Sequence, residues 1–435
     1  MDGLCGGRRP ASIPLFRSNE SCGICNPQVS GANCSRIVPR HDLKGPSMMK
    51  PIDILPSRRQ VFSRGLWGAA AIALSRMPAH SFGADVEQGD QLIPFMEPLK
   101  GAPGRAILNW DDLKDWITPA EQFFAVNHYG PAKLEGEYRL ELSGLVDKPL
   151  SLSLDDLKKR PKKEITATLE CSGNGSDKSF CGAIGNARWT GTPLAPLLRE
   201  CGIAPEAIEA AFYGMDHKVE KIAGADYDQN FSRSLPMKDA LRDDVILAYD
   251  MNGRPLSPDH GSPLRLVVPG WYGIAWVKWL QRIEVRDHRL MSKFMADKYV
   301  TLRGEEQSDG KIAWKQSSVG PMNIKSMVAK VIRRKDGGIT VMGAAWSGLN
   351  PLKAVELKVD DGDWIGAKLD DSHAEPFTWR FWTADWKDAK PGEHTLVSRA
   401  IDAKANLQPT AEEPAIKLKK TYYEANQQWP RKIKF

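Results

Sequence analysis

The stretch TLECSGNGSDKSFCGAIGNARWTG, residues 168–191, places Cys171 between a strand-like run and a glycine-rich bend. The run before it, EITATLE at residues 164–170, is rich in β-branched residues and predicts a strand. Gly173 and Gly175 permit the positive φ of a tight bend and the close approach of a bulky ligand. A thiolate presented at such a bend can coordinate a soft metal centre. A buried structural cysteine is the alternative that this stretch leaves open when it is taken alone.

The composition is that of an ordinary globular protein. The chain has 435 residues, of which 42% are hydrophobic and 26% charged, and this length suggests two or three domains. A formal net charge of +6 without a dense basic block is weak support for an acidic partner and gives no reason to expect nucleic-acid binding. No apolar run reaches the roughly 18 residues of a membrane-spanning helix, so no membrane span is expected.

The N-terminal region has the pattern of an export signal. Residues 57–64, SRRQVFSR, precede a short apolar stretch, GLWGAAAIAL at 65–74, and then small residues. A basic region, a brief apolar core and a small-residue exit are typical of a secretory signal peptide. The paired Arg58 and Arg59 indicate the twin-arginine type. We therefore expect a signal over 48–84 and a periplasmic protein that is exported already folded.

Residues 1–47 precede this signal and are interpreted as an N-terminal extension, either a mis-assigned start or a dispensable segment. The Cys22-Gly-Ile-Cys25 motif within it has no second pair at zinc spacing and no following histidine for haem attachment. Three cysteines remain in the mature chain, an odd number for an oxidising compartment: Cys171, Cys181 and Cys201. The last two can pair or simply be buried, which leaves Cys171 to be explained.

The mature chain divides into two parts with different patterns. Residues 85–316 mix expected strands with helices, and the clearest helix, 194–202, follows a Thr-Pro start signal. Residues 317–435 alternate apolar and polar positions around a turn at Asp361-Gly362, and several short strands over about 110 residues predict an immunoglobulin-type β-sandwich. The expected strands are 137–146, 164–170, 245–253, 264–270, 338–346, 354–369 and 393–402. The predicted fold class is therefore α+β.

Several ordered motifs resemble the sulfite oxidase family. TLECSGNG followed by GNARWTGTPLAPLL is similar to its molybdenum-binding segment, and FFAVNH at 123–128 to its upstream pterin-contact segment. DHGSPLRLVVPGWYGIAWVKWLQRIEV at 259–285 resembles its second pterin-binding block. The resemblance implies a mixed α/β molybdopterin domain over 85–316 and an immunoglobulin-like dimerisation domain over 317–435. It also implies a molybdenum cofactor, in the molybdopterin form without a mononucleotide, and a homodimer.

The resemblance also implies roles for individual residues, motif by motif. Cys171 matches the cysteine that supplies a thiolate to molybdenum. Tyr299 lies as far after Lys278 as the family's active-site tyrosine does, which implies a catalytic place beside the metal. The other implied cofactor-binding residues are Asn127, His128, Asp216, His260, Arg265, Trp276, Val277 and Lys278.

The residue types suit a pterin that carries a phosphate. Arg265 and Lys278 can give charge-assisted hydrogen bonds to the phosphate. His260 and Asp216 can satisfy donors and acceptors of the ring system. Taken singly, each has another interpretation: Asp216 as a turn residue, and Lys278 as a surface side chain lying along Trp279.

The chain departs from the family at the expected substrate pocket. Sulfite oxidases carry an arginine where this chain has Val126, basic residues at Gly175 and Ser176, and an arginine at Ala275. Each lost charged hydrogen bond is worth roughly 1.5–3 kcal/mol, so binding of a dianion should be strongly weakened. Sulfite oxidation is therefore in doubt unless other cations replace these charges, for which Arg188 and Lys178 are the candidates.

The function expected is oxygen-atom transfer by a periplasmic molybdenum oxidoreductase. Sulfite is the first substrate considered, and another sulfur compound or a neutral S- or N-oxide is the alternative. The chain has no haem segment of its own, so a separate periplasmic cytochrome c is expected to accept the electrons. Two other classes were considered, a cofactor-free binding module and a secreted hydrolase. The intact Cys171 and pterin motifs argue against the first, and the lack of a G-x-S-x-G motif against the second.

Overall fold

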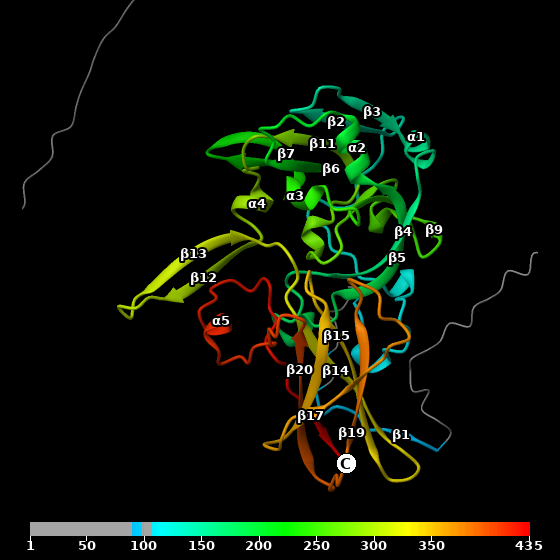
Figure 1. Cartoon of the computed structure of the whole chain (residues 1–435), viewed down its shortest axis with the longest axis vertical. Coiled ribbons are helices and arrows are strands. Elements are labelled where there is room, and N and C mark those ends of the chain that lie inside the picture. Colours follow the sequence, from blue (N-terminus) through cyan, green and yellow to red (C-terminus); the bar gives the residue numbers. More distant parts are fainter. Residues whose placement is uncertain (1–88, 98, 100–106) are drawn as a thin grey trace, which may run out of the picture. The chain divides into compact units, whose positions relative to one another are not determined.

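The structure is a computed structural model that describes residues 89–97, 99 and 107–435 (Figure 1). The expected N-terminal extension and signal, 1–47 and 48–84, lie outside the described residues. The described chain consists mainly of strands, and its helices are short. None of these helices is long and apolar enough to cross a membrane. They are α1 Leu154–Lys158, α2 Leu194–Glu200, α3 Met237–Ala240, α4 Lys293–Ala296 and α5 Pro414–Lys417, with 3-10 turns at Trp110–Asp112, Ala120–Gln122, Lys178–Phe180, Pro258–His260 and Gly273–Ala275.

One antiparallel sheet carries the cysteine-bearing bend. Its order is β10-β8-β5-β4, and a short β9 pairs with β8. Its strands are β4 Lys163–Glu170, β5 Ile184–Pro193, β8 Ile246–Met251, β9 Arg254–Pro255 and β10 Arg265–Val267. The bend with Cys171 follows the last residue of β4, and Arg265 is the first residue of β10. Two predicted site residues, from motifs almost a hundred positions apart, are thus placed by the same sheet.

A second sheet of the first domain has the order β3-β2-β11-β6-β7. Its strands are β2 Arg139–Gly144, β3 Leu150–Ser153, β6 Glu209–Ile222, β7 Ala225–Pro236 and β11 Leu280–Arg286. β11 runs parallel to β2, and the other pairs are antiparallel. The long β6–β7 hairpin was not among the strands expected from the sequence. The expected helix at 194–202 is found as α2, which begins directly after β5.

The second domain is formed by two further sheets, β1-β14-β15-β19-β18 and β17-β16-β20-β21. Their strands are β1 Gln91–Leu92, β14 Lys325–Arg333, β15 Ile339–Trp346, β16 Leu352–Val359, β17 Ile365–Gly366, β18 Lys368–Leu369, β19 Arg380–Trp386, β20 Glu393–Asp402 and β21 Arg431–Lys434. Their apolar faces form one core, with Val331 and Val341 from the first sheet and Leu357 and Leu396 from the second. Such facing sheets are the packing of a β-sandwich, as the alternating sequence pattern predicts.

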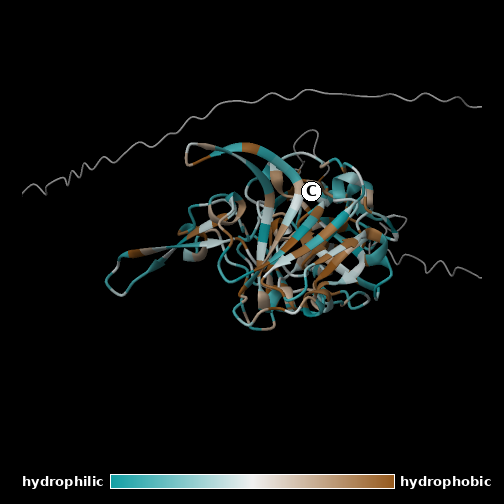
Figure 2. Ribbon diagram, turned by 90° about the horizontal axis from the view of Figure 1, so that it is seen from above, coloured by the Kyte–Doolittle hydropathy of each residue, from teal (hydrophilic) through white to brown (hydrophobic). Residues whose placement is uncertain are grey.

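The segment 354–369, expected as strands around a single turn, is divided between the two sheets. β17 pairs with β16, whereas β18 pairs with β19 of the other sheet. At the N-terminal side, β1 joins β14, so residues that precede the strands of the first domain in the sequence pair with the second domain. Hydrophobic residues concentrate along the packed strands, as the brown segments show (Figure 2).

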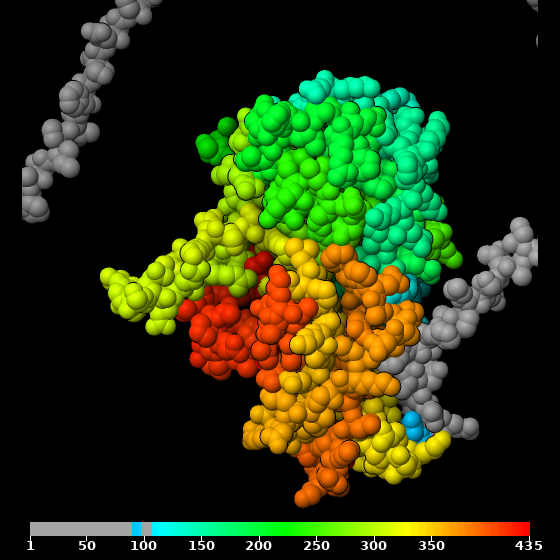
Figure 3. All heavy atoms as spheres, viewed as in Figure 1, coloured from blue at the N-terminus to red at the C-terminus, as the bar shows by residue number. Residues whose placement is uncertain are grey.

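A two-stranded hairpin, β12 Val300–Glu306 and β13 Ile312–Ser318, begins directly after Tyr299. The C-terminal segment lies against it, because Gly304 N–H donates to the Leu418 carbonyl and Lys420 N–H donates to that of Leu302. Figure 3 shows this red segment beside the yellow-green hairpin. The C-terminal segment therefore supports the hairpin that directly follows Tyr299.

Close approach of β5 and β8 requires glycine at position 191. A Cβ there would lie 2.1 Å from the Leu247 carbonyl oxygen, whereas a Cβ at Gly366 on β17 would meet nothing within 4 Å. We expect Gly191→Ala to lower the free energy of unfolding by about 1–3 kcal/mol, since overpacking forces strands apart. Gly366→Ala, the matched strand control, should change it by less than about 0.5 kcal/mol. Urea denaturation of both variants measures this, and equal effects would contradict the close approach.

Candidate active site

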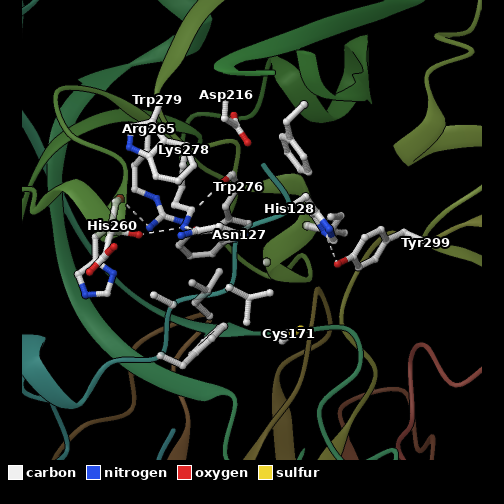
Figure 4. A pocket seen from close by; sticks show the side chains of 18 residues that line it. Asn127, His128, Cys171, Asp216, His260, Arg265, Trp276, Lys278, Trp279 and Tyr299 are labelled. Atoms are coloured by element: carbon white, nitrogen blue, oxygen red, sulfur yellow. Dashed lines mark hydrogen bonds between the residues drawn. The ribbon is translucent and has the colours of Figure 1, made fainter. Parts of the chain in front are cut away.

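A cavity of about 650 Å³ lies in the first domain and is lined by 18 residues (Figure 4). The structure brings nine of the ten predicted site residues to its wall: Asn127, His128, Cys171, Asp216, His260, Arg265, Trp276, Lys278 and Tyr299. Val277 is fully buried and does not line the cavity, although its carbonyl accepts from Leu266 N–H and fixes the turn that carries its neighbours.

The bend after β4 presents Cys171 at the cavity wall. Its backbone N–H donates to the Ala183 carbonyl at 2.9 Å, and its carbonyl accepts from Asn174 N–H at 2.9 Å. Gly175 has a φ of +83°, as the bend was predicted to need. Gly173 does not adopt a positive φ, and a Cβ there would lie in tight contact, at 3.2 Å, with the Tyr422 ring. Backbone bonds on both sides therefore fix the position of Cys171.

The other two cysteines of the described chain are buried and form no disulfide with each other. The Cys181 thiol donates to the Asp177 carbonyl at 3.1 Å, and burial raises its pKa to about 12. Burial also raises the pKa of Cys201, which caps the end of α2. Both thiols are thus protonated at neutral pH, and the pairing considered from the sequence does not occur.

Arg265 and His260 lie together on one side of the cavity. The buried Arg265 guanidinium donates to the carbonyls of His260, at 3.0 Å, and Trp276, at 3.3 Å, and lies 4.8 Å from the centre of the Trp189 ring. Burial lowers the pKa of Arg265 to about 9. His260 Nε2–H donates to the Ala120 carbonyl at 3.2 Å, and burial lowers the pKa of this imidazole. The neutral ring therefore keeps Nδ1 as an acceptor.

The Lys278 amine reaches the cavity beside these groups. It donates to the Asn127 side-chain oxygen and, at 2.9 Å, to the Asp259 carbonyl. It also lies 4.5 Å from the centre of the Trp279 ring, so the lysine-on-aromatic arrangement considered from the sequence is present together with the cavity position. Burial, and then the charge of Arg265, lower the pKa of Lys278 to about 7. An anionic ligand would restore the charged form of this amine.

Buried polar atoms without a hydrogen-bond partner show whether these residues suit a pterin. Asp216 Oδ1 and Arg265 Nε have no hydrogen-bond partner within the described part of the chain. Burial raises the pKa of Asp216 to about 6, so this carboxyl can change between donor and acceptor near neutral pH. Unpaired buried polar atoms are costly unless a ligand completes them. A polar, phosphate-bearing ring system fits this donor and acceptor set.

Tyr299 and His128 form the opposite side of the cavity. Tyr299 has a φ of +57° and its hydroxyl lies 2.7 Å from His128 Nε2. Burial lowers the pKa of His128, with Lys293 and Lys278 adding to this shift. Burial also raises the pKa of Tyr299 well above its usual value. Both groups are neutral near pH 7, and the phenol O–H can be donated either to His128 or into the cavity.

The sequence interpretation missed residues that support this side. Phe231 on β7 lines the cavity, and its ring lies 5.9 Å from that of His128. Arg233, two positions later and fully buried, donates to the carbonyls of Phe294 and Val319. Val319 N–H in turn donates to the Tyr299 carbonyl at 2.8 Å. The only sequence signal for Phe231 and Arg233 is the alternation of larger residues with serine in 229–236, a segment for which no strand is predicted.

The departures from the family pattern fall in different places. Val126 lines the cavity, whereas Ala275 is buried and does not. The two replacement cations considered from the sequence lie elsewhere: Arg188 is exposed on β5, and Lys178 is exposed and pairs with Glu97. Among the described residues that line the cavity, the only lysine or arginine side chains are Lys278 and Arg265.

Comparison with known proteins identifies the class. Residues 128–294 match the oxidoreductase molybdopterin binding domain, and residues 316–424 match the Mo-co oxidoreductase dimerisation domain. The sulfite oxidase of Gallus gallus is 33% identical over 329 residues, which cover 70% of this chain and 70% of that one. The chain belongs to the sulfite oxidase family of molybdopterin-binding oxidoreductases. The matched molybdopterin binding domain implies a molybdenum–pterin cofactor for this oxidoreductase.

Two further proteins are similar to this chain. The mitochondrial sulfite oxidase of Drosophila melanogaster is 32% identical over 329 residues, which cover 68% of this chain but only 56% of that protein. The crystal structure of the sulfane dehydrogenase SoxCD from Paracoccus pantotrophus matches with a TM-score of 0.61 and 28% identity. That match covers 84% of this chain and 92% of the other.

The lowered pKa of Lys278 should make the stability of the cofactor-free protein depend on pH. The pKa of Lys278 is about 7 in the folded state and 10.5 as its usual value. Between pH 7 and pH 10.5 the unfolded chain therefore binds more protons than the folded chain, and the free energy of unfolding rises with pH. From pH 7 to pH 9 we expect the free energy of unfolding to rise by about 1 kcal/mol more in the wild type than in Lys278→Met, a figure discounted for partial exposure. Urea denaturation at both pH values measures this, with the exposed Lys298→Met as the charge-matched control. Equal slopes in the wild type and Lys278→Met would contradict the burial of this amine.

Proposed function

We propose that this protein oxidises a sulfur compound by oxygen-atom transfer. The observation that carries the proposal is the division of one cavity into two sides: phosphate- and pterin-binding groups around Arg265 and Lys278, and the pair Cys171 and Tyr299 opposite them (Figure 4). When bound, the molybdenum–pterin group supplies the oxygen-atom transfer and takes up two electrons. The form of molybdopterin without a mononucleotide is the one we propose.

The chain's own residues bind and orient that group and the substrate. Cys171 would give its thiolate to the metal, and Arg265 and Lys278 would bind the phosphate through charge-assisted hydrogen bonds. Asp216 and His260 would complete the donors and acceptors of the ring. Tyr299, held 2.7 Å from His128, can donate its O–H to an oxygen atom of an oxyanion substrate bound beside it.

The substrate pocket favours a sulfur compound with less charge than sulfite. Val126 stands in the wall where sulfite oxidases carry an arginine, and Phe124, Ile274 and Leu169 add apolar surface. Sulfite dehydrogenase-like turnover remains the first activity to test, because the family relatives are sulfite oxidases. The similarity to a sulfane dehydrogenase supports a neutral, sulfane-type sulfur as the second candidate.

The electrons taken from the substrate pass from this enzyme to a separate protein. Addition of one oxygen atom from water to sulfur releases two protons and two electrons, so a one-electron acceptor is used twice. A periplasmic cytochrome c is the proposed acceptor, and the twin-arginine pattern at Arg58 and Arg59 supports export to that compartment. The matched dimerisation domain, residues 316–424, supports a homodimer.

Metal analysis of two cysteine variants tests the cofactor assignment. We expect purified wild-type protein to contain close to one molybdenum atom per chain and Cys171→Ser to contain little, because a hydroxyl is a much poorer ligand for this metal. Cys201→Ser, which replaces a buried thiol outside the cavity, should retain the metal. Equal molybdenum in all three proteins, or none in the wild type, would contradict the proposal.

Val126→Arg tests the substrate assignment. One charged hydrogen bond is worth about 1.5–3 kcal/mol, so this variant should lower the KM for sulfite by about ten- to hundredfold. Val126→Met controls for side-chain size and should leave the KM near the wild-type value. Reduction of cytochrome c by sulfite measures both. A wild type that already matches Val126→Arg would mean that other groups bind the dianion.

A further inference from the structure

A buried carboxylate lies directly before the proposed metal ligand. The Glu170 side chain is fully removed from solvent, at 0% exposure. Three donors surround it: Lys325 Nζ at 2.6 Å and Asn174 Nδ2 at 2.9 Å on one oxygen, and Trp346 Nε1 at 2.8 Å on the other. Because a buried charge is costly unless it is paired and hydrogen-bonded, Glu170 is confined to this one arrangement.

Two of the three donors belong to the second domain. Lys325 is the first residue of β14, Trp346 is the last residue of β15, and the two are register partners in the antiparallel ladder. Both are buried. Two paired residues at one end of the β14–β15 ladder therefore bind both carboxylate oxygens of Glu170, which belongs to the first domain.

The third donor, Asn174, connects Glu170 to the backbone of the cysteine bend. Asn174 Oδ1 accepts from Ala183 N–H at 3.0 Å, and the Ala183 carbonyl accepts from Cys171 N–H at 2.9 Å. Lys325 Nζ also donates to the Asn174 carbonyl at 2.9 Å. A closed set of hydrogen bonds thus runs from the second domain, through Glu170 and Asn174, to the backbone of Cys171.

We propose that Glu170, clamped by Lys325 and Trp346, is a positioning residue that fixes the direction of the Cys171 sulfur toward the metal. The inference rests on the proposed function, because it takes Cys171 as the metal ligand. Loss of a group that orients a metal ligand typically costs about 10- to 100-fold in metal affinity or activity. The second domain is then part of the metal site as well as a dimerisation module.

The sharpest test compares two buried tryptophans of the second domain. Trp346 Nε1 donates to Glu170, whereas Trp382 Nε1 has no hydrogen-bond partner within the described part of the chain, and both side chains are fully buried. Phenylalanine at either position removes a similar volume. Only Trp346→Phe removes a donor from the carboxylate, so Trp382→Phe is the matched control for lost packing.

The holoenzymes are compared by their thiolate-to-metal absorption band, molybdenum content, kcat and KM. The proposal predicts that Trp346→Phe shifts the band and lowers kcat by about tenfold at unchanged KM and metal content. Trp382→Phe should leave the band and kcat at wild-type values although its thermal unfolding midpoint falls. An unshifted band in Trp346→Phe, or equal shifts in both variants, would overturn the proposal.

Glu170→Gln provides a second variant if Trp346→Phe does not fold. The amide keeps the shape of the side chain but presents N–H to at least one of the three donors, so the same shift of the band is expected. A wild-type band in folded Glu170→Gln would overturn the positioning role. A wild-type protein without molybdenum would instead refute the proposed function, so the two failures are distinguishable.

Discussion

The buried ion pair between Glu170 and Lys325 joins the end of β4, directly before the cysteine bend, to the second domain. Both side chains are almost wholly removed from solvent, at 0% and 5% exposure. Removal of one partner from such a pair leaves an uncompensated buried charge, which typically costs about 3–5 kcal/mol. The junction around it is also apolar, since Trp346 joins a cluster with Trp110 and Trp379. The cysteine bend is therefore held where the two domains meet.

The electrostatics of the cavity follow from burial rather than from a dense set of charges. Arg265 and Lys278 lie in a poorly hydrated wall, and burial lowers the pKa of each. The same burial keeps His128 and His260 neutral near pH 7. The side with Arg265 and Lys278 thus favours an anionic group, and the side with His128 and Tyr299 presents neutral hydrogen-bonding groups. This division suits a phosphate-bearing cofactor together with a weakly charged substrate.

The position of Tyr299 depends on parts of the chain that no local pattern connects. The segment before it is held through Arg233, whose guanidinium bonds two carbonyls, and the hairpin after it is covered by the C-terminal segment. The Tyr299 ring also stacks on Tyr423, with centroids 4.8 Å apart. Its positive φ persists because these contacts from three segments fix both sides of the residue.

From the sequence came the resemblance that implied the cofactor and nine of the side chains at the cavity, and the positions of the sandwich strands β15, β16 and β20, whereas β14 and β19 were missed. The strands follow from period-two alternation, which is local, whereas the cofactor and the cavity residues follow from the resemblance of whole motifs to the sulfite oxidase family. Only the tertiary structure decided that Arg188 and Lys178 lie outside the cavity, that 354–369 divides between two sheets, and that Lys325 meets Glu170 across 155 positions. Such contacts depend on how sheets pack and which strands pair, and residue type alone does not encode the partner of a buried charge.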